Sequence, residues 1–280
     1  MREISSEKIF FEVKNLIRKA SFFLPKEILK KISDFKKKEK KTSTKKFLEI
    51  LEENAEIARK KEIPICQDTG TAVFFVEIGH EVFCKKPISE ILENATRESY
   101  RENFLRNSIC NDPVFDRKNT RNNLPAVFHL EQVRGKKLKI SFLAKGGGAE
   151  NKSILQMLSP DNAEKKIITL ITEAAKNAGA AACPPFLVGI GIGGNFDTVS
   201  VLAKKAILRS VNSKNANSKF AKLEEKIFTE IKKLKIGPGG LGGENFLLGV
   251  NIEFLPCHIA SLPVAVNFQC HAARFYSVEI

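Results

Sequence analysis

Glycine is concentrated in three short runs of this sequence, and these runs constrain the fold more than any other feature. Twelve of the 17 glycines lie in 146–148, 189–194 and 237–243. Glycine adopts backbone angles that other residues avoid, and a loop rich in glycine exposes backbone N–H groups to phosphates, carboxylates or cluster sulfides. One such run fits an ordinary tight turn. Three of them indicate a chain folded around ligand-binding loops.

The hydrophobic pattern between the glycine runs alternates between the periods of helices and strands. Apolar residues at three- and four-residue spacing predict helices within the first sixty residues and over 88–104, 160–178 and 199–211. Strands are predicted over 72–79, 139–144, 186–192 and 246–254, and a helical turn over 153–158. The polar stretch 107–125 has no clear period, so we expect a long ordered loop, which in a compact protein is usually functional.

These elements predict a mixed α/β (α+β) fold in which a helical N-terminal layer packs on a glycine-loop-rich sheet domain. The chain has 280 residues without a linker or an internal repeat, so we expect a single domain over 1–280. Hydrophobic residues make up 43% and charged residues 28%, which is typical of globular proteins. No apolar run is long enough to cross a membrane, and the N-terminus lacks a secretory signal. We therefore expect a cytoplasmic protein without membrane contact.

The net charge of +14 suggests an anionic partner, but its distribution argues against nucleic acid. Two windows, 26–46 and 213–235, carry +7 and +4 of this charge. Both windows are rich in lysine and contain no arginine and few aromatic residues, whereas base stacking and bidentate contacts favour arginine and rings. We therefore expect solvated helix faces and no nucleic-acid partner.

Two glycine runs invite comparison with phosphate-binding motifs. Gly189-Ile-Gly-Ile-Gly-Gly194 has the spacing of a dinucleotide-binding loop, so an NAD-dependent oxidoreductase is an alternative function. That motif needs an acidic residue about 20 residues further on to bind the ribose, and the sequence there is Ser210-Val-Asn-Ser-Lys-Asn215. The run 237–243 lacks the Lys-Ser or Lys-Thr of a P-loop. Both motifs are therefore incomplete.

The six cysteines are not arranged like the ligands of common zinc sites. No C-x-x-C pair occurs, which excludes the usual zinc ribbons and fingers. Cys257-His258 and Cys270-His271 could still form a zinc set, although their spacing matches no familiar pattern. Cys84 and Cys110 are interpreted as residues of the hydrophobic core.

Three cysteines lie beside turn-forming residues instead. Cys66 precedes Gln-Asp-Thr-Gly, Cys183 precedes two prolines, and Cys270 lies in Gln-Cys-His-Ala-Ala-Arg. Three such thiolates could hold three irons of a 4Fe–4S cluster and leave the fourth iron open. An open iron is a Lewis acid that can bind a substrate hydroxyl and carboxylate.

These motifs together resemble the α-type catalytic domain of the iron–sulfur hydro-lyases, the class I fumarases and tartrate dehydratases. The resemblance covers about residues 60–275, with the motifs in the family's order. Its segments are Ile65-Cys-Gln-Asp-Thr-Gly70, Asp116-Arg-Lys-Asn-Thr120, Lys145-Gly-Gly-Gly-Ala-Glu-Asn151, Cys183-Pro-Pro185, Gly189-Ile-Gly-Ile-Gly-Gly194, Gly237-Pro-Gly-Gly-Leu-Gly-Gly243 and 258–274. One departure is Arg121-Asn122-Asn123, where the family usually has Gly-Asp-Asn.

The resemblance implies a set of site residues. The cluster ligands correspond to Cys66, Cys183 and Cys270. Contacts to substrate carboxylates correspond to Gln67, Asp68, Arg106 and a glycine-loop amide near Gly147. Asp68 and His258 are the expected catalytic residues, and His258 matches a histidine that reaches the site of a neighbouring α subunit.

The resemblance also implies a function and partners. We expect the α subunit of a 4Fe–4S hydro-lyase that reversibly hydrates fumarate to malate, with an L-tartrate dehydratase α subunit as the alternative. The expected partner is a β-type subunit with a swivelling C-terminal domain, because this chain ends six residues after Arg274 and has no room for that domain. The role of His258 across an α–α interface implies an α dimer within a heterotetramer.

Overall fold

The computed structural model describes residues 1–280, and its contacts divide the chain into two compact units. Unit 1 comprises residues 1–25, 55–147 and 274–280, and unit 2 comprises residues 26–54 and 148–273. The chain therefore passes between the units four times, and neither unit is one continuous segment. The organisation of both units as a single domain over 1–280 stays a prediction.

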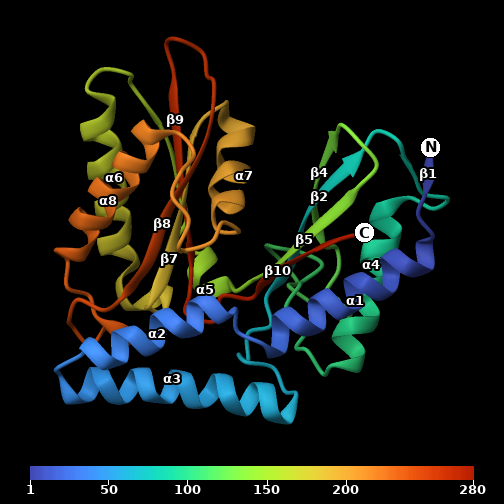
Figure 1. Ribbon diagram of the computed structural model, residues 1–280, viewed down its shortest axis with the longest axis horizontal. Coiled ribbons are helices and arrows are strands. Elements are labelled where there is room, and N and C mark those ends of the chain that lie inside the picture. The colour runs from blue at the N-terminus through green and yellow to red at the C-terminus, as the bar shows by residue number, and fades with distance from the viewer. The chain divides into compact units, whose positions relative to one another are not determined.

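Unit 1 is built on a four-stranded mixed sheet with the strand order β10-β5-β2-β4 (Figure 1). Its strands are β2 (Thr71–Gly79), β4 (Val127–Val133), β5 (Leu138–Lys145) and β10 (Phe275–Glu279). The strand β2 runs parallel to β4 and antiparallel to β5, and β10 is antiparallel to β5. A separate parallel pair joins β1 (Arg2–Glu3) to β3 (Val82–Phe83).

Two helices, α1 (Ser6–Phe22) and α4 (Ile88–Glu102), cover one face of this sheet. Ser5 caps α1 by accepting a hydrogen bond from the Lys8 N–H at 3.2 Å, which satisfies one of the unpaired donors of the first turn. The apolar faces of both helices meet alternate residues of β2 and β5 in one core. This arrangement confirms the predicted mixed α/β fold, with an N-terminal helix packed on a sheet.

Unit 2 contains a second mixed sheet, with the strand order β6-β9-β7-β8. Its strands are β6 (Ile154–Leu158), β7 (Phe186–Gly193), β8 (Leu247–Leu255) and β9 (Leu262–Gln269). The central strands β7 and β9 are antiparallel, whereas β7 and β8 are parallel. Parallel strands require a crossover, and here it is made by α7 (Phe196–Ala206) and α8 (Ser218–Lys232).

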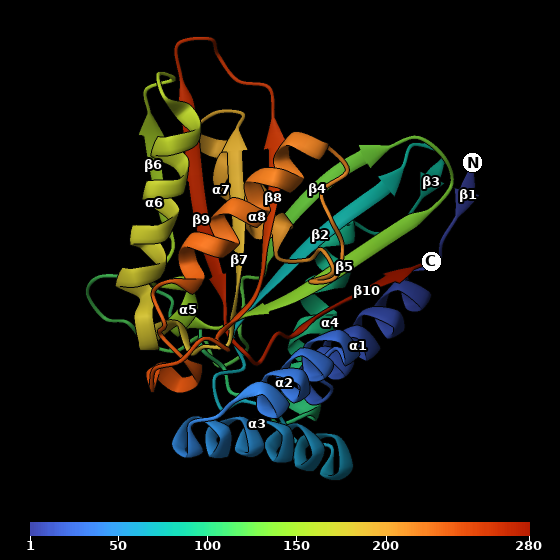
Figure 2. The ribbon, with the colours of Figure 1, turned by 60° about the vertical axis from the view of Figure 1, so that its left-hand side comes forward.

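Helices cover both faces of the unit 2 sheet (Figure 2). The face with α8 also carries α6 (Ala163–Ala178), and α7 lies on the other face. The remaining elements of the chain are α2 (Lys26–Lys38), α3 (Thr42–Lys61), α5 (Gly147–Glu150), η1 (Gly179–Ala182) and η2 (Pro238–Gly240). A strand packed between helices must be apolar on both sides, and β7 is buried over its whole length.

The glycines of 189–194 serve the packing of α7 and do not form a dinucleotide loop. Gly189 and Gly191 lie inside β7, where the backbone of α7 approaches closely. A Cβ on Gly191 would lie 2.1 Å from the carbonyl oxygen of Val199 in α7. The prediction of a ligand-binding loop is wrong for this run, because the missing side chains make room for a helix. The alternative of an NAD-dependent oxidoreductase thereby loses its one supporting motif.

Most of the secondary structure predicted from the sequence is confirmed, and one element is wrong. The four predicted strands are present, with no end shifted by more than one residue, and 107–125 is a long loop. The predicted helical turn at 153–158 is wrong, since these residues form β6 and pair with β9. The two lysine-rich windows contain α2 and α8. No helix in the structure has both the length and the apolar character needed to span a membrane.

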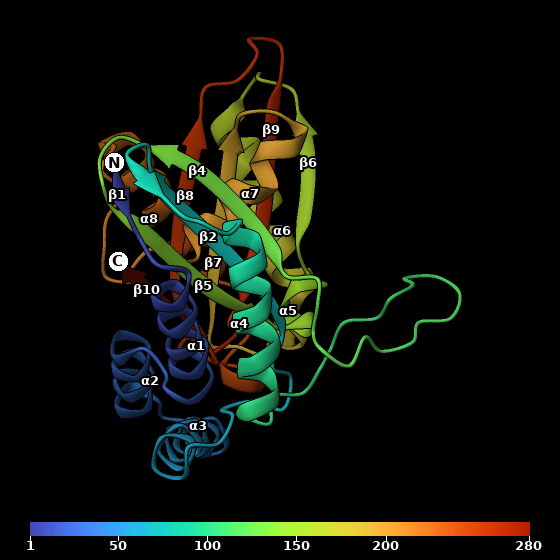
Figure 3. The ribbon, with the colours of Figure 1, turned by 90° about the vertical axis from the view of Figure 1, so that its right-hand side faces the viewer.

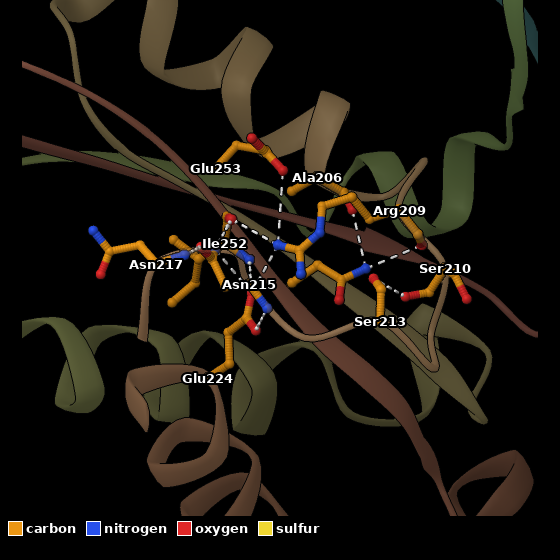
Figure 4. Close-up of polar contacts among 10 residues, drawn as sticks. Ala206, Arg209, Ser210, Ser213, Asn215, Asn217, Glu224, Ile252 and Glu253 are labelled. Atoms are coloured by element: carbon orange, nitrogen blue, oxygen red, sulfur yellow. Dashed lines mark hydrogen bonds and ion pairs between the residues drawn. The ribbon is translucent and has the colours of Figure 1, made fainter. Parts of the chain in front are cut away.

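A buried ion pair orders the connection between α7 and α8 (Figure 4). The Arg209 guanidinium donates to the Glu224 carboxylate at 2.8 Å and lies 3.7 Å from Glu253. Glu224 has only 8% of its side chain exposed, and it also accepts hydrogen bonds from the backbone N–H groups of Asn215 and Ile252. The connection, α8 and β8 are therefore joined through one carboxylate.

We predict that Glu224→Ala destabilises the protein by about 3 kcal/mol, because removal of one partner leaves a buried charge and unpaired N–H groups. Equilibrium unfolding in urea measures this difference. The matched control is Glu225→Ala, whose carboxylate pairs with Lys214 at 3.4 Å on the surface, where such pairs contribute about 0–1 kcal/mol. Equal effects of the two substitutions would contradict the role of Glu224.

Candidate active site

In unit 1, the segment 65–70 connects α3 to β2 and carries three of the predicted site residues. Ile65 anchors its start, since its N–H donates to the Ser21 carbonyl at 3.0 Å. Tyr100 anchors its end: the phenol hydroxyl of this α4 residue lies 3.1 Å from the Thr69 carbonyl oxygen and 3.0 Å from that of Gly70. Between these anchors, Cys66 is half-buried and Gln67 is exposed.

Asp68 is the best-connected side chain of this segment. One carboxylate oxygen accepts the Gly70 N–H at 3.1 Å, which closes the turn, and the other accepts the Gly147 N–H at 2.8 Å. The Arg106 guanidinium lies 3.8 Å from the first oxygen and is 57% exposed. The structure therefore brings together Asp68, Arg106 and Gly147. It also shows the glycine run 146–148 binding a carboxylate, as predicted for such a loop.

The Gly147 amide and Asp68 are already bound to each other. A substrate carboxylate that used this amide would have to replace the Asp68 oxygen. The roles of Asp68, Gln67, Arg106 and Gly147 toward substrate stay predictions.

Two buried residues that support this segment were not among the predicted site residues. Arg274 is 2% exposed and donates from its guanidinium to the Asp68 carbonyl oxygen, while its Nε has no hydrogen-bond partner. Burial raises the pKa of Tyr100, so the hydroxyl stays protonated and remains a donor. The sequence could have pointed to Arg274, because it is the last residue of a motif that carries the family resemblance. For Tyr100, the only indication in the sequence was its position on the apolar face of a predicted helix.

Asn123 attaches the loop after Arg106 to the same segment. Its side-chain amide donates to the Gly70 carbonyl at 3.1 Å, and its side-chain oxygen accepts the Ser108 N–H at 2.8 Å. Asn123 is fully buried and has a φ of 56°, a left-handed conformation that asparagine tolerates better than most residues. Residues 121–123 are Arg-Asn-Asn where the family usually has Gly-Asp-Asn. The residue that they share with the family, Asn123, is the one that holds the loop in place.

In unit 2, the structure brings two predicted cluster ligands to one end of the sheet. The strands β7 and β9 are antiparallel with Leu187 opposite Gln269, so the chain before β7 lies beside the chain after β9. Cys183 precedes β7 and Cys270 follows β9, and the His271 N–H donates to the Cys183 carbonyl at 3.3 Å. Cys183 is exposed, with a φ of 54° that directs it out of regular structure.

The third glycine run supports this end of the sheet and does not offer free amides. The Gly239 N–H donates to the carbonyl of Pro184, directly after Cys183, at 2.9 Å. Other amides of 237–243 donate to backbone carbonyls at 235–238. The loop closes tightly, since a Cβ on Gly237 would lie 2.0 Å from the Gly242 oxygen. The prediction that this run cradles a ligand is therefore wrong, and its role is to position the Cys183 turn.

The two Cys-His pairs that could have formed a zinc site are too far apart to bind one ion. Cys257 and His258 lie before β9, whereas Cys270 and His271 follow it. Eight strand residues separate the two pairs by about 26 Å at 3.3 Å per residue, so they cannot bind one ion. No group of three or more His, Cys, Asp or Glu side chains in the chain is arranged to hold a metal ion.

The same distance applies to His258, which is exposed in the connection from β8 to β9, at the opposite end of β9 from Cys270. Its Nδ1 accepts the Ala260 N–H at 3.1 Å, which leaves Nε2 for another partner. His258 cannot reach the Cys270 end of its own strand. Its predicted action in a neighbouring subunit requires this separation.

The donor chemistry of the remaining cysteines fits an iron–sulfur cluster. None of the six cysteines forms a disulfide, and Cys66, Cys183 and Cys270 all lie in turns. Cys84 packs half-buried against the unit 1 core, and burial raises the pKa of its thiol, which disfavours the thiolate that a metal requires. Cys110 was wrongly expected in the core: it is half-buried in the loop after Arg106, where it forms a bridge with Asn119.

The chain is similar to known proteins over nearly its whole length. Residues 11–279 match the family described as Fumarate hydratase (Fumerase). The chain is 35% identical to a putative L(+)-tartrate dehydratase subunit alpha of Methanocaldococcus jannaschii over 283 residues, covering 95% of each chain. It is 31% identical to the L(+)-tartrate dehydratase subunit alpha of Escherichia coli K12 over 264 residues, covering 94% of this chain and 87% of that relative.

The fold, the cysteine turns and these matches define an iron–sulfur hydro-lyase, the class of enzyme that adds or removes water. The chain belongs to the class I fumarate hydratase family, as the sequence motifs predicted. Membership implies an iron–sulfur cluster. The assignment of Cys66 in unit 1 and of Cys183 and Cys270 in unit 2 as its ligands stays a prediction.

We predict that Cys66→Ser, Cys183→Ser and Cys270→Ser each abolish cluster binding, whereas Cys84→Ser and Cys110→Ser preserve it. After anaerobic reconstitution, wild type should bind about four irons per chain, as a [4Fe–4S] cluster requires, and show visible iron–sulfur absorption. Iron content, absorption and circular dichroism of each variant check the ligands and the fold together. A folded Cys183→Ser variant that keeps its cluster would contradict the ligand set.

Proposed function

We propose that this hydro-lyase is the α-type subunit of an enzyme that dehydrates L(+)-tartrate, a four-carbon dicarboxylate with two hydroxyls. The observation that carries the proposal is the length of its likeness to proteins named L(+)-tartrate dehydratase subunit alpha, which extends over 95% of both chains in one case. The expected preference for fumarate receives less support. It stays a second candidate because the family description names fumarate hydratase.

Dehydration of either substrate class needs two carboxylates held while a hydroxyl leaves. When bound, a cluster with an open iron supplies a Lewis acid for that hydroxyl. Among this chain's own residues, Arg106 has an exposed guanidinium suited to a bidentate carboxylate contact, and Gln67, the residue before Asp68, has an exposed amide. Asp68 closes the turn at Gly70 and orients the Arg106 guanidinium through their contact at 3.8 Å.

The second requirement is a base for the proton on carbon, and we assign it to another chain. A base must lie within hydrogen-bonding reach of the proton that it removes. His258 is at the far end of β9 from Cys270, so within its own subunit it is about 26 Å from that ligand. We propose that the β-type subunit supplies this base and completes the enzyme as a heterotetramer, and that His258 contributes to the site of a second α subunit without serving as the base. The relatives' designation as subunit alpha supports a β partner.

We also propose a cytoplasmic location. The six cysteines form no disulfide, and a cluster with an open iron survives best where thiols stay reduced.

We predict that the complete enzyme has a kcat/KM for L(+)-tartrate at least ten-fold above that for malate or fumarate. The keto product of tartrate dehydration and the absorbance of fumarate allow both reactions to be followed with the same protein. D-tartrate is the matched control, because it presents the same groups with the wrong stereochemistry. A higher kcat/KM for fumarate would overturn the tartrate assignment and leave the hydro-lyase class intact.

We further predict that the reconstituted α chain binds its cluster alone but turns over at less than about a hundredth of the rate seen with the β-type subunit, since it lacks the base. Titration of the α chain with the β-type subunit at fixed substrate concentration measures the gain. Full activity of the isolated α chain would show that the base is among these 280 residues.

A further inference from the structure

Residues 41–47 of unit 2 lead from α2 into the first turns of α3, and we refer to them as the clamp. In Figure 3, as in Figure 1, α2 and the start of α3 lie beyond the end of the unit 2 sheet at which β7 begins. This is the end of the sheet that carries Cys183 and Cys270. The clamp contains none of the predicted site residues, and no role has yet been assigned to it.

Two side chains of the clamp bind the backbone of the third glycine run, 237–243. The Lys41 ammonium donates to the Leu241 carbonyl oxygen at 2.6 Å, and the Thr44 hydroxyl donates to that of Gly242 at 3.4 Å. Thr44 is fully buried. Because a buried polar group that loses its partner is costly, this contact fixes the glycine run to α3.

Phe47 packs against the same run and against the residue after Cys270. A Cβ on Gly239 would lie 3.0 Å from a carbon of the Phe47 ring, so the half-buried ring lies directly on this glycine. The ring also meets the His271 imidazole edge to face, with the ring centroids 6.4 Å apart. One side chain of α3 therefore contacts both the loop that supports the Cys183 turn and the chain beside Cys270.

The glycine run holds the Cys183 turn from both sides. After the cysteine, the Gly239 N–H donates to the Pro184 carbonyl oxygen at 2.9 Å. Before the cysteine, the run packs on η1, since a Cβ on Gly240 would lie 2.4 Å from that of Ala180. A displacement of the run therefore shifts the backbone that directs the Cys183 thiol.

We propose that the clamp positions the Cys183 and Cys270 turns for cluster binding, with Phe47 as its main positioning residue. This rests on the proposed assignment of the two cysteines as cluster ligands. A phenyl ring offers no ligand atom, so Phe47 acts through Gly239 and His271. Groups that orient metal ligands typically change metal affinity by about 10- to 100-fold when they are replaced.

The test compares Phe47→Ala with the matched control Phe220→Ala in the full chain. Phe220 is a half-buried residue of α8 whose ring stacks on that of Phe254 at 3.9 Å. Phe254 pairs with Ile192 at the opposite end of β7 from Cys183. Both variants lose a half-buried ring from a helix of unit 2, so urea unfolding should show similar losses of stability. Only Phe47→Ala should disturb the cysteine turns.

The first measurement is hydrogen exchange in the chain without its cluster. It follows the two amides that hold the cysteine turns, those of Gly239 and His271. We expect both amides to exchange at least about ten-fold faster in Phe47→Ala and to stay within about two-fold of wild type in Phe220→Ala.

The second measurement is the rate at which a chelator removes iron from the anaerobically reconstituted protein. We expect iron loss to be at least about five-fold faster in Phe47→Ala and unchanged in Phe220→Ala. A further variant, Thr44→Val, keeps the shape of the buried side chain and removes its hydrogen bond to Gly242. It should raise both rates by about three-fold, and it decides the matter if Phe47→Ala does not fold.

Unchanged exchange at both amides in Phe47→Ala and Thr44→Val would overturn the proposal. So would faster exchange with unchanged iron loss, because the turns would then move without effect on the cluster. A wild type that binds no cluster would overturn it as well. Neither measurement uses a substrate. A protein that shows the expected changes but does not dehydrate L(+)-tartrate would therefore refute the proposed substrate and leave the role of the clamp standing.

Discussion

The organisation of the unit 1 site depends on one carboxylate, that of Asp68. It binds the amides of Gly70 and Gly147 and lies beside Arg106, and its own backbone carbonyl accepts a hydrogen bond from the buried Arg274. Because these partners come from the turn before β2, the start of α5, the loop after α4 and the residue before β10, one aspartate joins four segments. Asp68 would therefore be difficult to replace even by asparagine, which puts an NH₂ where an amide donor now points.

In the second sheet, two of the candidate site residues, His258 and Cys270, lie at opposite ends of the strand β9. Cys270 follows β9 beside Cys183, whereas His258 precedes β9 in the exposed connection from β8. A strand that is eight residues long and buried over nearly its whole length is too stiff to bring both ends to one substrate. The separation of the two residues is the reason for the proposal that His258 acts in a second α subunit.

Some of this could be predicted from the sequence, and the failures have physical causes. Strands such as 186–192 were predictable because their apolar runs are short and bounded by turn residues. The strand β6 was mistaken for a helical turn because Ile154-Leu-Gln-Met-Leu158 has good helix formers, and its pairing with β9 overrides that propensity. The candidate ligands followed from family motifs. The adjacency of Cys183 and Cys270, the support from Tyr100 and the close approach of α7 to Gly191 depend on tertiary contacts that no local pattern records.

The repeated passage of the chain between the units has a consequence for biosynthesis. Unit 2 contains every strand from β6 to β9, and Arg274 follows all of them in the chain. A ribosome therefore completes the second sheet before it releases the residue that holds the Asp68 carbonyl and the strand β10 that finishes the first sheet. Until then one edge of β5 has no partner strand and is open to pairing with an incorrect strand or another chain. The cysteines of unit 2 are therefore synthesised before the buried arginine that holds the Asp68 turn of unit 1.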